Sequence, residues 1–147
     1  MTTTNEQDTK HWLYFGECCS LMERWVKAEQ VDLVYLDPPW QPKRANNVLH
    51  REKDGSESIA SVEAFDRTWR WGPEAASVET TLMATDGPVA TTLDGFKRIY
   101  ESDQHTYAYL VQMGRMLVDV RHVTKPGGSV YLNADEMLNA PLRILGD

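Results

Sequence analysis

The sequence predicts an α/β fold: an open, mostly parallel β-sheet with flanking helices. Residues 12–36 read as an apolar strand-like run, a helical segment and a second run rich in β-branched residues. Two strands joined by a helix within such a short stretch are typical of a βαβ unit, whose strands run parallel. A later segment, residues 106–122, has apolar residues at helical spacing, and another apolar run follows at 129–133.

The first elements can be placed from their ends. Residues 12–15 form a short apolar run before Gly16, which predicts a buried strand. Ser20 and Glu23 fit a capping box, with Ser20 as the N-cap of a helix and Glu23 reaching back to it. The run at 31–36 ends before two prolines, which cannot donate to a sheet ladder, so a second strand is predicted to end there.

The later elements are less sharply marked. Residues 41–61 are polar and predict a loop, and short helices are predicted at 73–83 and 89–100. In the helix predicted at 106–122, four apolar residues share one face: Leu110, Met113, Leu117 and Val120. Its end is predicted at residues 125–128, Lys-Pro-Gly-Gly, because proline cannot continue a helix and glycine accepts a positive φ. We therefore expect a flexible tail at 1–10 and a folded domain at 11–147.

Composition excludes several classes of protein. The 147 residues carry a net charge of −7, so the chain is not a non-specific coat for nucleic acid. No apolar run is long enough to cross a bilayer, and the N-terminus lacks the apolar core of a signal peptide. The two cysteines, Cys18 and Cys19, are adjacent and lack zinc-ligand spacing. We expect a cytoplasmic protein without a membrane segment, a disulfide or a metal.

One tetrapeptide carries a chemical signal. Asp37, Pro38, Pro39 and Trp40 directly follow the strand predicted at 31–36. Ligands of open α/β sheets bind at the carboxyl ends of the strands, which is where this tetrapeptide lies. The alternative is a proline-rich turn with a capping aspartate, and we favour the functional reading.

This tetrapeptide resembles the hallmark of the DNA amino-methyltransferases, Asp-Pro-Pro followed by an aromatic residue. Residues 14–18, Tyr-Phe-Gly-Glu-Cys, resemble the strand ending in Gly-Asp-Cys that precedes it in that family, with Glu17 in place of Asp. Residues 65–71 resemble the family's FDDTWRW, with Arg67 in place of the second Asp, and residues 125–132 resemble its KPTGSIYL. The motif order is that of the permuted group, in which the glycine loop for S-adenosylmethionine comes last. The resemblance implies an incomplete Rossmann-like methyltransferase fold.

The resemblance also implies the chemistry: transfer of a methyl group from S-adenosylmethionine to the exocyclic N6 amine of a flipped adenine in DNA. The Asp37 carboxylate and the Pro38 carbonyl would hold the two amine N–H groups and free the nitrogen lone pair. Proline suits this role because it fixes φ and has no N–H to compete as a donor. Trp40 would stack on the flipped base. Cytosine-N4 methylation is the alternative within the enzymes.

Further site residues follow from the same resemblance. Glu17 and Cys18 would lie near the adenine of the cofactor, together with Asp37; the alternative for the cysteines is core packing. Four basic residues after the motif could hold DNA phosphates, unless this is simply a solvated loop: Lys43, Arg44, Arg51 and Lys53. Trp69 and Trp71 could stack on bases, although core packing is the better interpretation.

No pair of glycines in the chain forms the Gly-x-Gly turn that the family uses for its cofactor. We therefore expect a catalytic-motif fragment that a C-terminal half or a second chain completes. A non-catalytic remnant that binds nucleic acid or a partner is the other hypothesis. The helix implied around 136–145 contains Pro141, which would cost about 3 kcal/mol in a helix interior.

Overall fold

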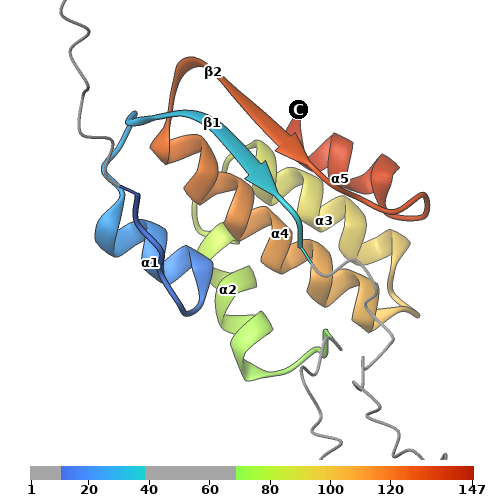
Figure 1. Cartoon of the computed structure of the whole chain (residues 1–147). Helices are drawn as coiled ribbons and strands as arrows, with labels where there is room; N and C mark the ends of the chain where they lie inside the picture. The colour runs from blue at the N-terminus through green and yellow to red at the C-terminus, as the bar shows by residue number, and fades with distance from the viewer. Residues whose placement is uncertain (1–10, 39–68) are drawn as a thin grey trace, which may run out of the picture.

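The computed structural model describes residues 11–38 and 69–147, which form a layer of helices with a two-stranded parallel sheet on one side (Figure 1). Two predicted site residues, Pro39 and Trp40, and the four basic residues predicted to hold phosphates lie outside the described residues. The tail predicted at 1–10 lies outside them as well. In chain order the elements are α1 (Cys18–Trp25), β1 (Val31–Leu36), α2 (Pro73–Met83), α3 (Pro88–Ile99), α4 (Gln104–Val123), β2 (Thr124–Leu132) and α5 (Asn139–Gly146).

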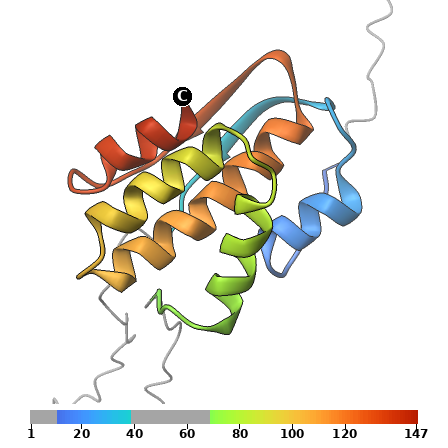
Figure 2. The ribbon, with the colours of Figure 1, turned by 180° about the vertical axis from the view of Figure 1, so that it is seen from behind.

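Helix α4 is the centre of the fold. Ten of its 20 residues are buried, because it contacts α1, α2, α3 and α5 (Figure 2). Its side chains Tyr109, Leu110 and Val111 have no exposed surface, and neither has Leu93 of α3. The apolar face predicted from residues 110, 113, 117 and 120 is therefore real, but the buried surface extends well beyond it, as expected of a helix surrounded by others.

The two strands run parallel and are paired from Leu33 with Ser129 to Leu36 with Leu132. Before Leu33 the register shifts, because β2 has extra residues at its Pro-Gly-Gly stretch. Gly127 there has a φ of +81°, which favours glycine. At Gly128 a Cβ would lie 3.1 Å from the Asp32 carbonyl oxygen in β1. The glycines predicted to separate helix from strand thus form an irregularity within the strand, which begins directly after α4.

The sheet is covered on one face. Side chains of Leu33, Tyr35 and Tyr131 are 58%, 66% and 57% exposed, and cross-strand pairing puts them on the same face. On the opposite face, Leu132 packs against the core. In the described ranges the fold is therefore mixed α/β with helices on one side of a two-stranded parallel sheet.

Two sequence predictions near the N-terminus are wrong. Residues 12–15 form no strand, and Leu13 and Phe15 are fully exposed, because no strand of the described chain pairs with them. Helix α1 is not capped by Ser20. Instead, Glu17 is its N-cap and accepts hydrogen bonds from the backbone N–H groups of Cys19 and Ser20, so the helix begins three residues earlier than predicted.

The helices predicted later in the chain are confirmed with shifts of at most three residues. β2 begins five residues before the strand predicted at 129–133, and the loop predicted at 41–61 lies outside the described residues. The strand at 31–36 and the helix at 73–83 have the predicted bounds, and the helix predicted at 89–100 is α3. Pro141 lies in the first turn of α5, where its missing N–H breaks no helical bond, so the expected cost does not arise. Trp69 and Trp71 pack against the core, as favoured from the sequence. No helix in the described ranges is both long and apolar enough to span a membrane.

Candidate functional site

The carboxyl ends of the two strands bring Asp37 and Asn133 together. Each directly follows a strand, Asp37 after β1 and Asn133 after β2, and parallel pairing places both strand ends at the same edge of the sheet. The Asn133 backbone N–H donates to the Leu36 carbonyl oxygen at 2.9 Å. The Asn133 side chain then donates from Nδ2 to Asp37 Oδ1, also at 2.9 Å.

Asp37 is exposed, whereas the next residue, Pro38, is buried. The turn after β1 is therefore anchored by the proline ring and by the hydrogen bond to Asn133, and it presents a carboxylate at the surface. Within the described part of the chain, Asn133 is the hydrogen-bonding partner of this carboxylate, and it uses only one of the two oxygens. The other oxygen, Oδ2, can accept a hydrogen bond from a ligand.

Sequence reasoning missed Asn133. The signal that could have found it is positional: a polar residue directly after a strand predicted to be parallel to the strand of Asp37. Since carboxyl ends of parallel strands meet at one edge, polar residues at those positions become neighbours even when they are 96 positions apart.

Asp135, just beyond Asn133, connects this edge to the core. Its Oδ1 accepts a hydrogen bond from the Leu138 backbone N–H at 2.8 Å. Burial, with an added contribution from the Asp135 charge, raises the pKa of Tyr109 to about 12. The Tyr109 hydroxyl is buried and has no hydrogen-bond partner among the described residues. The ring of Trp69 packs edge-on against Tyr109, with centroids 5.7 Å apart.

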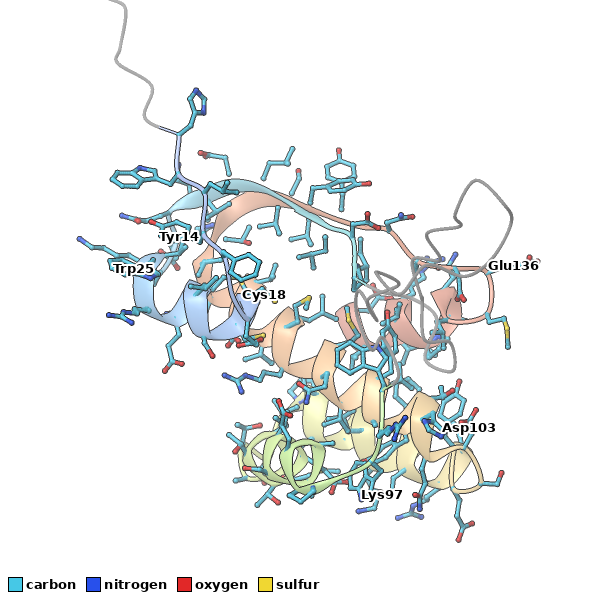
Figure 3. The ribbon with its side chains drawn as sticks, turned by 60° about the horizontal axis from the view of Figure 1, so that its bottom comes forward. Tyr14, Cys18, Trp25, Lys97, Asp103 and Glu136 are labelled. Carbon is cyan, nitrogen blue, oxygen red and sulfur yellow. The ribbon has the colours of Figure 1, made fainter. Side chains whose placement is uncertain are left out.

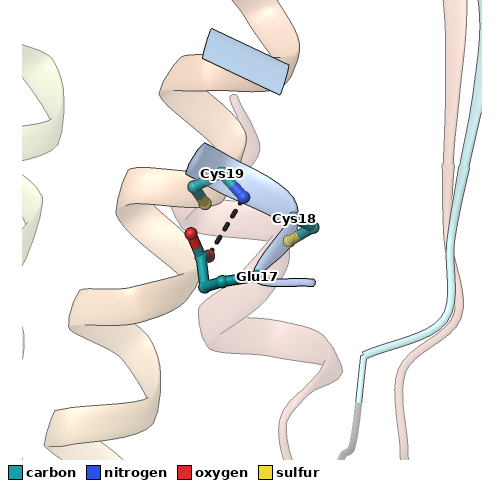
Figure 4. Close-up of side chains that lie close together, drawn as sticks. All are labelled: Glu17, Cys18 and Cys19. Atoms are coloured by element: carbon teal, nitrogen blue, oxygen red, sulfur yellow. Dashed lines mark hydrogen bonds between the residues drawn. The ribbon is translucent and has the colours of Figure 1, made fainter. Parts of the chain in front are cut away.

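A second group of polar atoms lies at the start of α1. Glu17 Oε1 accepts from Cys19 N at 3.0 Å (Figure 4), and Oε2 accepts from Ser20 N at 2.7 Å. Burial alone would raise the pKa of Glu17. The hydrogen bonds to its carboxylate have a larger combined effect, and the pKa is lowered. A hydrogen bond from the Cys19 thiol lowers the pKa of exposed Cys18 to about 7. The same hydrogen bond, with burial and the nearby Asp119, raises the pKa of Cys19.

This group has the donor atoms of a metal site, but not all of these atoms are free to bind an ion. Three ligand atoms lie within 4.8 Å of one another, one from each of Glu17, Cys18 and Cys19. Both Glu17 oxygens, however, already cap α1, and Cys19 is buried. The arrangement accounts for the helix start by itself and identifies Cys18 as the reactive thiol.

Neighbouring side chains extend this N-terminal group. Tyr14 stacks on Trp25 with ring centroids 5.8 Å apart, and Figure 3 shows both at the same end of the molecule as Cys18, away from Glu136 of the loop after β2. No hydrogen bond or ion pair described in residues 11–38 and 69–147 joins Glu17 or Cys18 to Asp37. The hydrogen bonds of Glu17 are to the start of α1, and that of the Asp37 side chain is to Asn133 after β2.

The predicted cofactor residues do not line the groove beside β2. This groove, of about 930 Å³, lies between β2, the end of α4, the start of α3 and α5, and its lining includes none of Glu17, Cys18 and Asp37. The Glu17 carboxylate caps α1 with both of its oxygens, and each oxygen keeps a lone pair that can accept a further hydrogen bond.

No protein-family model, curated protein or solved structure gives a significant match to this chain.

Proposed function

We propose that this chain supplies the amine-binding half of a DNA methyltransferase that modifies the N6 amine of a flipped adenine. The observation that carries the proposal is the Asp37-Pro38 turn at the carboxyl end of a parallel strand, with its carboxylate exposed and tied to Asn133. The sequence resemblance of residues 37–40 to the Asp-Pro-Pro-aromatic hallmark supports it. In this proposal S-adenosylmethionine donates the methyl group and is held mainly by a segment that carries the glycine loop.

The role of Asp37 follows from the chemistry of an aromatic amine. Such a nitrogen is a poor nucleophile because its lone pair is delocalised into the ring. A carboxylate oxygen and the Pro38 carbonyl oxygen each accept one N–H, which favours a more tetrahedral nitrogen and localises the lone pair. The carboxylate acts as an acceptor and not as a strong base, since the amine becomes very acidic once it is methylated. Fixing the amine in line with the methyl group supplies much of the rate by positioning.

The remaining predicted residues complete the proposal. Trp40 stacks on the flipped base, and the basic residues at 43, 44, 51 and 53 hold phosphates on either side of it. Glu17 and Cys18 contact the cofactor, and the Glu17 carboxylate can accept a hydrogen bond from it while capping α1. The partner is DNA, together with the missing half on the same or a second polypeptide.

The test is methyl transfer by the enzyme completed with its glycine-loop segment. The completed enzyme is incubated with methyl-labelled S-adenosylmethionine and DNA, and the modified nucleosides are separated. We expect N6-methyladenine; label in N4-methylcytosine identifies the alternative target. Asp37→Ala should reduce turnover by at least 100-fold and change DNA affinity less than threefold, because phosphate contacts dominate affinity.

Asp32→Ala is the matched control. It makes the same change on the same strand and removes an exposed ion pair with Lys125, with 2.7 Å between Nζ and Oδ1, which is worth at most about 1 kcal/mol. Activity close to wild type is expected for this variant. If Asp37→Ala keeps near-normal turnover, or if the completed enzyme binds DNA without transferring any label, the proposal is wrong and the non-catalytic alternative is favoured.

A further inference from the structure

The side chain of Asn133 makes a contact that the sheet itself does not require. The pairing of the strand ends is already made by its backbone, through the N–H that donates to Leu36 O. The additional bond, from Nδ2 to Asp37 Oδ1, is between two exposed side chains. Because both side chains are exposed, water competes for this bond, and the bond adds little to the stability of the fold.

We propose that Asn133 is the positioning residue for Asp37: it holds the carboxylate in one orientation, with Oδ1 occupied and Oδ2 presented to the substrate amine. This inference rests on the proposed function for its kinetic consequence, but the orientation itself is a property of the chain alone. The backbone bond of Asn133 fixes its main chain beside Leu36, which places the carboxamide within hydrogen-bonding reach of Asp37 at the end of β2. A free aspartate side chain would rotate among staggered χ1 wells and present either oxygen.

The same bond also affects the chemical role of the carboxylate. A donor on Oδ1 neutralises part of the carboxylate charge and leaves a single acceptor facing the substrate. The geometry therefore suits a group that accepts one N–H from an amine while the second N–H goes to a carbonyl. Misorientation by about 1 Å can reduce turnover about 100-fold, because the reacting atoms no longer align.

The kinetic test compares three variants of the completed enzyme. Asn133→Asp keeps the shape of the side chain but removes the donor and adds a like charge, and it should lower kcat between 10- and 100-fold with KM for DNA changed less than threefold. Asn133→Gln keeps the carboxamide and should recover at least part of kcat. Asn139→Asp makes the same chemical change at the exposed first residue of α5 and should retain wild-type kcat.

The orientation test needs no reaction and uses residues 1–147. In the wild-type chain, χ1 coupling constants measured by NMR should show one rotamer for Asp37, and the Asn133 side-chain amide resonances should move in Asp37→Ala. In Asn133→Ala the Asp37 couplings should average over rotamers. A single unchanged Asp37 rotamer in Asn133→Ala overturns the inference whatever the activity.

The two proposals can fail separately. Normal kcat in Asn133→Asp, in an enzyme that transfers methyl groups, overturns the role of Asn133 and leaves the proposed function standing. Absence of methyl transfer in the wild type, with Asp37 released from its rotamer in Asn133→Ala, overturns the function and leaves the orientation by Asn133 standing.

Discussion

Two tyrosines on α4 provide a matched test of the packing described here. Tyr107 and Tyr109 are 5% and 0% exposed, and each ring contacts a tryptophan. The Tyr107 hydroxyl donates to Glu79 Oε1 at 2.5 Å, whereas the Tyr109 hydroxyl has no partner in the described chain. Replacing each tyrosine by phenylalanine keeps the ring and removes only the hydroxyl, so the packing contributions nearly cancel.

The two changes should have opposite effects on stability. Tyr107→Phe removes a hydrogen bond to a charged group, worth about 1.5–3 kcal/mol, although Glu79 keeps its ion pair with Lys97 at 2.9 Å. Tyr109→Phe removes a buried hydroxyl without a partner, which relieves a desolvation cost of about 1–3 kcal/mol. We expect the first variant to be less stable than wild type by about 1–2 kcal/mol and the second to be more stable by about 1 kcal/mol.

The assay is urea unfolding at pH 7, supported by thermal unfolding, in which 1 kcal/mol corresponds to about 2–4 °C for a chain of this size. Equal destabilisation by the two substitutions would refute the reasoning, because it would mean that the Tyr109 hydroxyl is bonded in solution.

Alkaline pH gives a second readout from the same variants. Burial, with a smaller contribution from the charge of Asp135, raises the pKa of Tyr109 from 10.0 to about 12. Burial and the hydrogen bond to Glu79 also raise the pKa of Tyr107. Both phenols are neutral in the fold, so their contribution is fully present below about pH 10 and is lost as the pH rises through the folded-state pKa. Each phenylalanine variant should lose less stability than wild type between pH 9 and pH 12.

Two further predictions concern β2 and α1. Gly128→Ala places a Cβ 2.6 Å from Thr124 Cγ2 and 3.1 Å from the Asp32 carbonyl oxygen, so it should destabilise the chain by about 1–3 kcal/mol in urea unfolding. Gly146→Ala, which meets nothing within 4 Å, is its control and should stay within about 1 kcal/mol of wild type. An alkylating reagent should label Cys18 increasingly fast from pH 6 to pH 8, because its pKa is about 7 and the thiolate is the nucleophile. Cys18→Ser should remove the fast phase, since the remaining thiol, Cys19, is buried; fast labelling that persists in this variant would contradict the assignment.

The sequence was most informative where structure depends on nearby residues. Helix α2 could be placed at its observed bounds because Pro73 suits the first turn of a helix and the apolar spacing continues to Met83. β1 was predictable for the same reason, since its β-branched run ends before a proline pair. Glu17 shows the limit of local rules: glutamate is an uncommon N-cap, and only the geometry shows its side chain reaching two backbone N–H groups.

Features that depend on distant partners were not predictable from local patterns. Residues 12–15 have the composition of a buried strand, but a strand forms only where another strand pairs with it, and composition does not supply the partner. Asn133 was missed because its importance depends on the register between β1 and β2. The prediction of Asp37 depended on a motif, whereas the contact of Asp37 with Asn133 depends on the pairing of the two strands.

The two strands are far apart in the sequence, and this separation also determines when the sheet edge that carries Asp37 can form during folding. Asp37 and Asn133 are 96 positions apart, so joining their strands closes a loop whose entropy costs about 4 kcal/mol beyond the constant term. Helices α2, α3 and α4 contact one another through short connections and can assemble before that loop closes. The strand pair, and with it the Asp37–Asn133 contact, is then the last part of the described chain to form and the first to open, so amide exchange should be faster in β1 than at the centre of α4.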